Sequence, residues 1–101
     1  MKICFGVKEG FFLYDVADIK VRPVGVEGNN DKEDKYKQYF IEIVLHTVSD
    51  MMVRVKSQFP YPKDALEYVL RSIIEQMSKC DHVNVTDIAE WDLIEVRNER
   101  R

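Results

Sequence analysis

The sequence predicts an α+β fold, an antiparallel sheet of about five or six strands with one long amphipathic helix packed on one face. Several segments alternate apolar and polar residues, as half-buried strands do, whereas residues 62–80 repeat their apolar residues with a helical period. With 101 residues, 46% of them hydrophobic, residues 1–101 suit a single domain with its own core. A polar, charge-balanced segment at residues 27–38 is expected to be a flexible surface loop.

The first part of the chain is predicted to form three strands. Lys2–Val7 alternates, and the glycine-containing turn at residues 8–10 favours a hairpin with a return strand at Phe11–Val16. In a third strand, Asp18–Val26, the apolar phase slips by one residue near Pro23. Because proline cannot donate to a ladder, this slip predicts an edge strand with a bulge at that position.

The clearest strand pair is a hairpin of Tyr39–Val48 and Met51–Phe59. A two-residue turn would place Lys56 opposite Ile43 and bury a charge, so the pattern favours a three-residue turn at residues 48–50. That register pairs Ile43 with a valine. It also places Glu42 opposite Lys56, which predicts an exposed ion pair.

The helix is predicted over residues 62–80. Pro62 suits the first helical position, and the charge of Asp64 favours the dipole of the first turn. The apolar residues recur at the i, i+3, i+4 spacing and predict one buried stripe. This stripe contains Ala65, Leu66, Val69, Leu70, Ile73, Ile74 and Met77.

The last segment permits two interpretations. Ile94 and Val96 alternate, which favours a strand over Trp91–Val96. The alternative is a short helix, capped by Asp87 with Glu90 three residues later.

Charge and cysteine content exclude some classes of protein. The chain has 15 Lys and Arg against 18 Asp and Glu, so its net charge of −3 makes nucleic-acid binding a less favoured expectation. Two cysteines are too few for a disulfide framework, and the N-terminus lacks the apolar region of a signal peptide. No apolar run is long enough to span a bilayer. We therefore expect a cytoplasmic protein that does not associate with membranes.

The sequence contains no recognisable catalytic or cofactor-binding motif. Residues 80–82, Cys-Asp-His, are the only local group of metal-ligating types, and neighbouring residues rarely all face one ion. His46 and Glu42 lie four apart on one strand face, where they could form an acid/base couple in a cleft, but an exposed polar row is favoured. We expect no cofactor or metal, and binding rather than catalysis, although the sequence leaves the question of an enzyme open.

Self-association through the sheet is the favoured function. The strand face that would point away from the helix holds more apolar residues than a solvated face usually does. A second copy could cover it, which predicts a homodimer whose interface contains Phe40, Val44, Val48 and Met52.

Two alternatives use other surfaces. An inhibitor or adaptor of another protein could use an acidic surface with an aromatic anchor, formed by Trp91, Asp87, Glu90 and Asp92. A nucleic acid could bind a basic row on the sheet, formed by Arg54, Lys56, Lys35 and Lys37.

Overall fold

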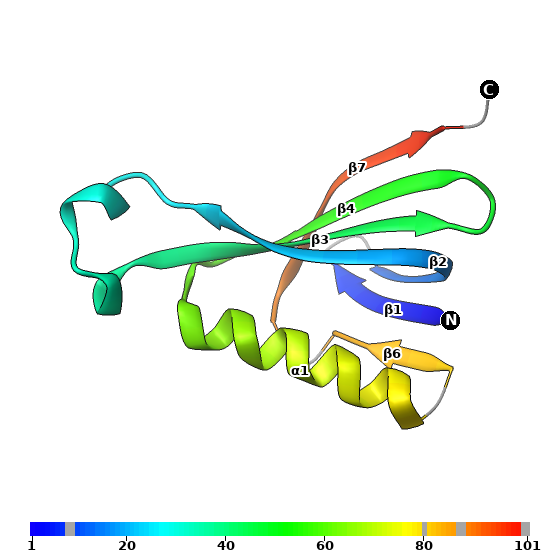
Figure 1. The fold of residues 1–101 in the computed structure, drawn as a ribbon. Helices are drawn as coiled ribbons and strands as arrows, with labels where there is room; N and C mark the ends of the chain where they lie inside the picture. The colour runs from blue at the N-terminus through cyan, green and yellow to red at the C-terminus, as the bar shows by residue number, and fades with distance from the viewer. Residues whose placement is uncertain (8–9, 80, 87–88, 100–101) are drawn as a thin grey trace.

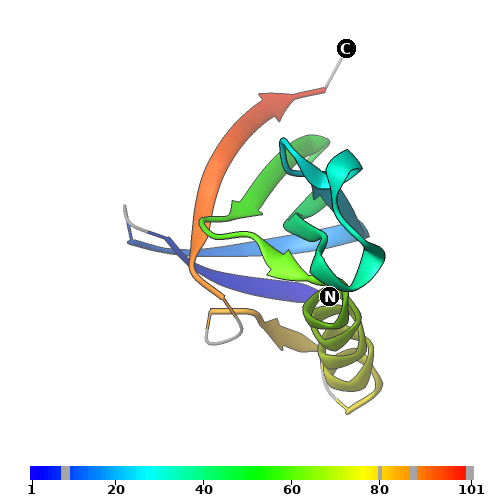
Figure 2. The same ribbon diagram turned by 90° about the vertical axis from the view of Figure 1, so that its left-hand side faces the viewer.

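The computed structural model describes residues 1–7, 10–79, 81–86 and 89–99, and it confirms the α+β fold (Figure 1). The strands are β1 (Lys2–Val7), β2 (Gly10–Gly25), β3 (Gln38–Thr47), β4 (Met51–Ser57), β5 (Tyr61–Pro62), β6 (His82–Asn84) and β7 (Trp91–Asn98). The helix α1 spans Lys63–Lys79, and two 3₁₀ turns, η1 (Asn29–Asp31) and η2 (Asp34–Tyr36), lie between β2 and β3. In Figure 2, these turns lie toward the viewer and α1 lies beneath the sheet.

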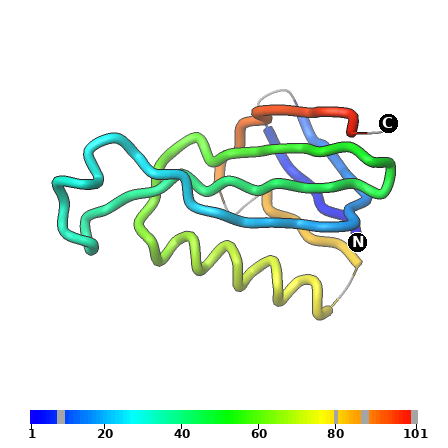
Figure 3. Tube along the Cα trace, turned by 45° about the horizontal axis from the view of Figure 1, so that its top comes forward, coloured from blue at the N-terminus to red at the C-terminus, as the bar shows by residue number. Residues whose placement is uncertain are grey.

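The strands of the described residues form one mixed sheet, not a wholly antiparallel one. β1 runs parallel to β6 and, at the single pair Val7 and Trp91, parallel to β7, while the other pairings are antiparallel. β2 pairs with β1 through residues 10–15 and with β3 through residues 16–25. The strands β1, β2, β3, β4 and β7 therefore pair in a closed circuit. Figure 3 shows β1 and the first part of β2 running at a steep angle to β3 and β4.

β2 replaces the two separate strands that the sequence predicts before residue 27. Its register slips between Val16 and Asp18, where the chain leaves β1 and begins to pair with β3. Pro23 pairs with Ile41 without a break in register. The bulge predicted at Pro23 is therefore wrong, because the irregularity arises where β2 changes its neighbour.

The β3–β4 hairpin has the predicted register. Ile43 pairs with Val55, and a three-residue turn joins the strands. Asp50 adopts a left-handed backbone conformation (φ 62°) and its amide donates to the carbonyl of Thr47 at 3.2 Å. The amide of Met51 donates to Oγ1 of Thr47 at 3.1 Å, so this side chain also closes the turn.

The core lies between the sheet and α1. It is built from apolar side chains that alternate along the strands, together with the tail before β7. Its buried members are Ile3, Phe5, Val16, Ile41, Ile43, Leu45, Val53, Val55, Val69, Ile73, Val83, Val85 and Trp91. α1 therefore contributes two buried residues, Val69 and Ile73.

The prediction that all seven apolar residues of the helix are buried is wrong. Leu70, Ile74 and Met77 are 43%, 57% and 45% exposed. The helix is rotated so that Gln76, rather than these residues, faces the end of the sheet, where its side chain bonds the backbone of Asn84 in β6. Leu70, Ile74 and Met77 are called the exposed stripe below.

The tail forms β6 and β7, as the strand interpretation predicts for Trp91–Val96. Trp91 is 1% exposed, its Nε1–H donates to the carbonyl of Val85 at 2.7 Å, and its ring packs edge-on against Phe5. No helix in the described part of the chain is both long and apolar enough to cross a membrane.

Candidate functional site

The outer surface of β2, β3, β4 and β7, on the side away from the core, brings together residues from several sequence predictions. Cross-strand registers align Arg22, Glu42, Lys56 and Asp92 in one row, while a neighbouring row contains Val44 and Arg54. We call this surface the charged face. Its residues are Asp18, Lys20, Arg22, Phe40, Glu42, Val44, His46, Met52, Arg54, Lys56, Asp92, Glu95, Arg97 and Glu99.

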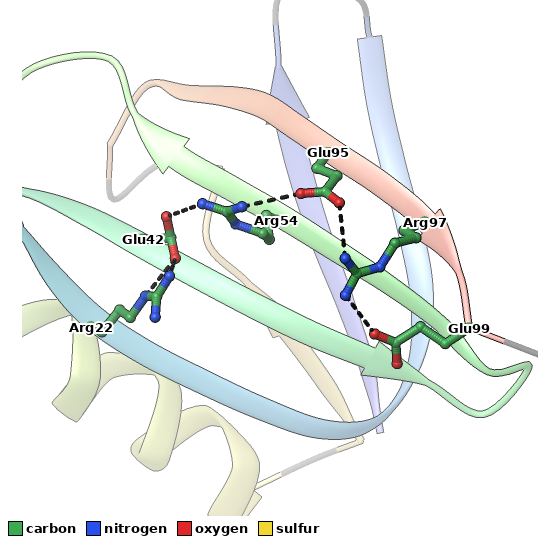
Figure 4. Close-up of polar contacts among 6 residues, drawn as sticks. All are labelled: Arg22, Glu42, Arg54, Glu95, Arg97 and Glu99. Atoms are coloured by element: carbon green, nitrogen blue, oxygen red, sulfur yellow. Dashed lines mark hydrogen bonds and ion pairs between the residues drawn. The ribbon is translucent and has the colours of Figure 1, made fainter.

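A chain of alternating charges crosses this face (Figure 4). Glu42 bonds Arg22 through Oε1 and Arg54 through Oε2, the latter at 3.0 Å. Arg54 reaches across to Glu95 at 3.1 Å. Arg97 links Glu95, at 3.6 Å, to Glu99, at 3.0 Å, and Nδ1 of His46 lies 3.3 Å from Glu99.

Among the described residues, Glu42 is the most enclosed charged group, with only 3% of its side chain exposed. Burial by itself would raise its pKa, but hydrogen bonds and charge from Arg54 and Arg22 outweigh burial and lower the pKa. Both carboxylate oxygens accept from a guanidinium. Glu42 is therefore an ionised structural centre and is not available as a general base at neutral pH.

The surface above Arg54 is hollowed by about 320 Å³. Two apolar side chains, Val44 and Met52, line this hollow together with charged ones. The charged residues lining it are Lys20, Arg22, Arg54, Glu95, Arg97 and Glu99, and His46 also lines it. Most of these charged groups already pair with each other or with Glu42.

The four residues of the predicted apolar interface do not make a continuous apolar surface. Met52 is 5% exposed, whereas Val48 lies in the turn and is 62% exposed. Phe40 lies under the ammonium group of Lys56, at 4.7 Å from the ring centroid. A charged side chain of the same chain thus lies over one of the four residues, Phe40, while Val44 and Met52 line a hollow between charged groups.

The basic row is divided between two places. Arg54 and Lys56 lie on the charged face, and Arg54 already bonds two carboxylates. Lys35 and Lys37 lie at η2, where they pair with Glu33 and Asp34. The four residues therefore do not form one basic surface.

The acidic surface lacks the aromatic anchor proposed for it. Trp91 is in the core, because its indole N–H finds a backbone partner there and its ring packs on Phe5. Glu90 is exposed, and Asp92 accepts from Gln58 at 2.9 Å. Asp87 lies outside the described residues.

The predicted acid/base couple and metal group also separate. His46 pairs with Glu99 and Glu42 pairs with two arginines, so they do not form a couple. No group of three or more metal-ligating side chains is placed to hold an ion within the described part of the chain, and Cys80 lies outside it.

Sequence reasoning missed Arg22, Glu95, Arg97 and Glu99 as partners on this face. Their alternation with apolar residues along β2 and β7 was visible, but only the strand order places them beside β3 and β4. It also missed the exposed stripe of α1, since the helical period does not show how far the sheet extends beneath the helix.

Comparison with known proteins gives no relative: no family model, no curated protein and no solved structure matches the chain.

Proposed function

We propose that this protein is a non-enzymatic binding protein that works as a homodimer. The two copies associate through the side of the molecule where the exposed stripe of α1 lies next to β2. The observation that carries this proposal is the exposed stripe. Three large apolar side chains, Leu70, Ile74 and Met77, follow each other along one side of α1 and are about half exposed. Burying the remaining surface of such a side chain is worth about 1 kcal/mol.

Position supports this surface over the charged face. Leu66, one turn before Leu70, lines a hollow with Pro23 and Tyr39, so this side of the helix lies toward β2. Ala65 and Tyr68 line another hollow with Tyr61 and Ala89, toward β5 and β7. The exposed stripe therefore adjoins the apolar border of the core at β2. Together they form a larger apolar surface than single exposed residues would.

The two alternatives from the sequence have weaker support. A nucleic-acid surface would need unpaired cations on one face, and Arg54, Lys35 and Lys37 each have an acidic neighbour. An adaptor surface around Trp91 would need the ring outside the core.

Sedimentation velocity over a range of concentrations tests the proposal. The wild-type protein should sediment as a species of twice 11.9 kDa at high concentration and dissociate on dilution. Ile74→Glu should remain monomeric, because it places a charge inside the apolar contact.

Tyr68→Glu is the matched control. Tyr68 is 64% exposed on the opposite flank of α1, so the same kind of change there should leave dimerisation intact. A wild-type protein that is monomeric at its highest soluble concentration would refute the proposal.

A further inference from the structure

Beyond the register slip between Val16 and Asp18, one edge of β2 is unpaired among the described residues. β3 occupies one side of residues 16–25, while β1 pairs only with residues 10–15. The amide of Val16 donates to the carbonyl of Met1 at 2.7 Å. From residue 17 onward, the second side of β2 faces no strand among the described residues, which leaves backbone donors and acceptors for another strand. We call residues 17–22 on this side the open edge.

The open edge and the exposed stripe lie on the same side of the molecule. Pro23 and Leu66 line one hollow, and Figure 3 shows α1 running alongside β2 beyond the sheet. Ile19 and Val21, which point into the core side of β2, are only half-buried at this border. One partner could therefore pair with the edge and cover the stripe at once.

We infer that this partner is a second copy whose β2 pairs antiparallel with β2 across the open edge, about a two-fold axis at Ile19. This inference rests on the self-association proposed above and specifies its geometry. Main-chain hydrogen bonds would join the two sheets into one, as in strand addition at other sheet edges.

The register follows from faces, proline and charge. In an antiparallel pair, opposite residues share a face. The two-fold axis must therefore run between a residue and the same residue of the other copy. Pro23 cannot donate a hydrogen bond, which confines the pairing to residues before it and the axis to Ile19 or Lys20.

Charge selects between these two axes. An axis at Lys20 sets Lys20 against its own copy, and like charges directly opposite destabilise a sheet. An axis at Ile19 sets Asp18 of each copy opposite Lys20 of the other, which makes two attractive pairs. Asp18 and Lys20 are both exposed, and neither has an ion pair within the described residues.

The same axis determines where the two α1 helices lie relative to each other. With the axis perpendicular to the joined sheet, both α1 helices lie on one side of it, and their exposed stripes turn toward each other across the dyad. The two charged faces lie on the other side and become continuous. The dimer thus covers the apolar surface and enlarges the polar one.

Charge exchange at positions 18 and 20 tests this geometry. Asp18→Lys and Lys20→Asp should each weaken homodimerisation roughly tenfold, because each sets like charges opposite twice. The double variant Asp18→Lys/Lys20→Asp should recover wild-type affinity. A mixture of the two single variants should form a heterodimer tighter than either homodimer, measured by sedimentation and native mass spectrometry.

Glu27→Lys and Lys32→Asp are the matched controls, since both residues are exposed in the segment between β2 and β3. They change the net charge equally and should leave the affinity unchanged. If the wild type dimerises but the exchange variants do not respond, the register is wrong and the proposed function stands. If the wild type does not dimerise at all, both fail.

Discussion

At the scale of single residues, Glu42 shows how the charged face is held together. Its predicted position opposite Lys56 is correct, but the predicted exposed ion pair is not what forms. Two arginines take both carboxylate oxygens, while Lys56 lies over the ring of Phe40. The planar guanidinium matches a carboxylate better than an ammonium does, which explains why the arginines bind the buried oxygens.

Replacing this carboxylate should therefore destabilise the protein. Glu42→Gln keeps the shape and removes the charge, and we expect a loss of about 1–3 kcal/mol, since buried hydrogen bonds to charged groups are lost. Urea denaturation at neutral pH measures the loss. Glu95→Gln, at a half-buried position in the same chain of charges, should cost less than about 1 kcal/mol. Equal losses of unfolding free energy in the two variants would mean that the burial of Glu42 does not strengthen its contribution to stability.

The lowered pKa of Glu42 gives the protein a defined acid sensitivity. Arg54 and Arg22 outweigh burial and hold the folded pKa below the reference value of 4.5. A group whose folded pKa is lowered stabilises the fold above its unfolded pKa, and this stabilisation is lost as the pH falls through the folded pKa.

We therefore expect the stability difference between wild type and Glu42→Gln to be constant above about pH 5.5 and to shrink below about pH 4.5. Urea midpoints at a series of pH values measure it. Glu75 and Glu99 also have lowered pKa values, but both proteins share them, so they cancel in the difference. A difference that grows on acidification would contradict this assignment.

At the scale of elements, α1 contains two neighbouring isoleucines that the sequence pattern predicts to be buried but that differ in exposure. Ile73 and Ile74 both belong to the predicted apolar stripe, yet Ile73 is 2% exposed and Ile74 is 57% exposed. Ile73→Ala should cost about 2–5 kcal/mol, because it leaves a cavity in the core. Ile74→Ala should cost less than about 1 kcal/mol when measured by urea denaturation at low protein concentration. Similar losses would place both residues in the core of the monomer.

The elements that the sequence predicts well are those with local rules. The β3–β4 register follows because the competing register would bury Lys56, and the bounds of α1 agree within one residue with the prediction. Strand order follows from contacts far apart in the chain, such as Val7 with Trp91, and no local pattern contains them. The charged face is therefore predictable only in part. Its β3 and β4 residues share one hairpin, which local pattern predicts. Arg22 and Glu95 join the face only through the order of strands in the closed circuit.

At the scale of the whole molecule, the placement of surfaces links stability to concentration. Most charged groups at the centre of the charged face pair within one copy, whereas the open edge of β2 and the exposed stripe of α1 have no partner among the described residues and lie on one common side. A fold that leaves these surfaces to a second copy gains stability by mass action, since dimerisation favours the folded state.

The thermal midpoint should accordingly rise by several degrees for each tenfold increase in protein concentration. Differential scanning fluorimetry or calorimetry across concentrations measures this, with Trp91 as a core reporter for fluorescence. Ile74→Glu should have a midpoint that does not change with concentration, near the dilute limit of the wild type, while Tyr68→Glu should follow the wild-type slope. A wild-type midpoint independent of concentration would mean that the monomer alone accounts for the stability, and the exposed stripe would then contribute nothing to the folded state.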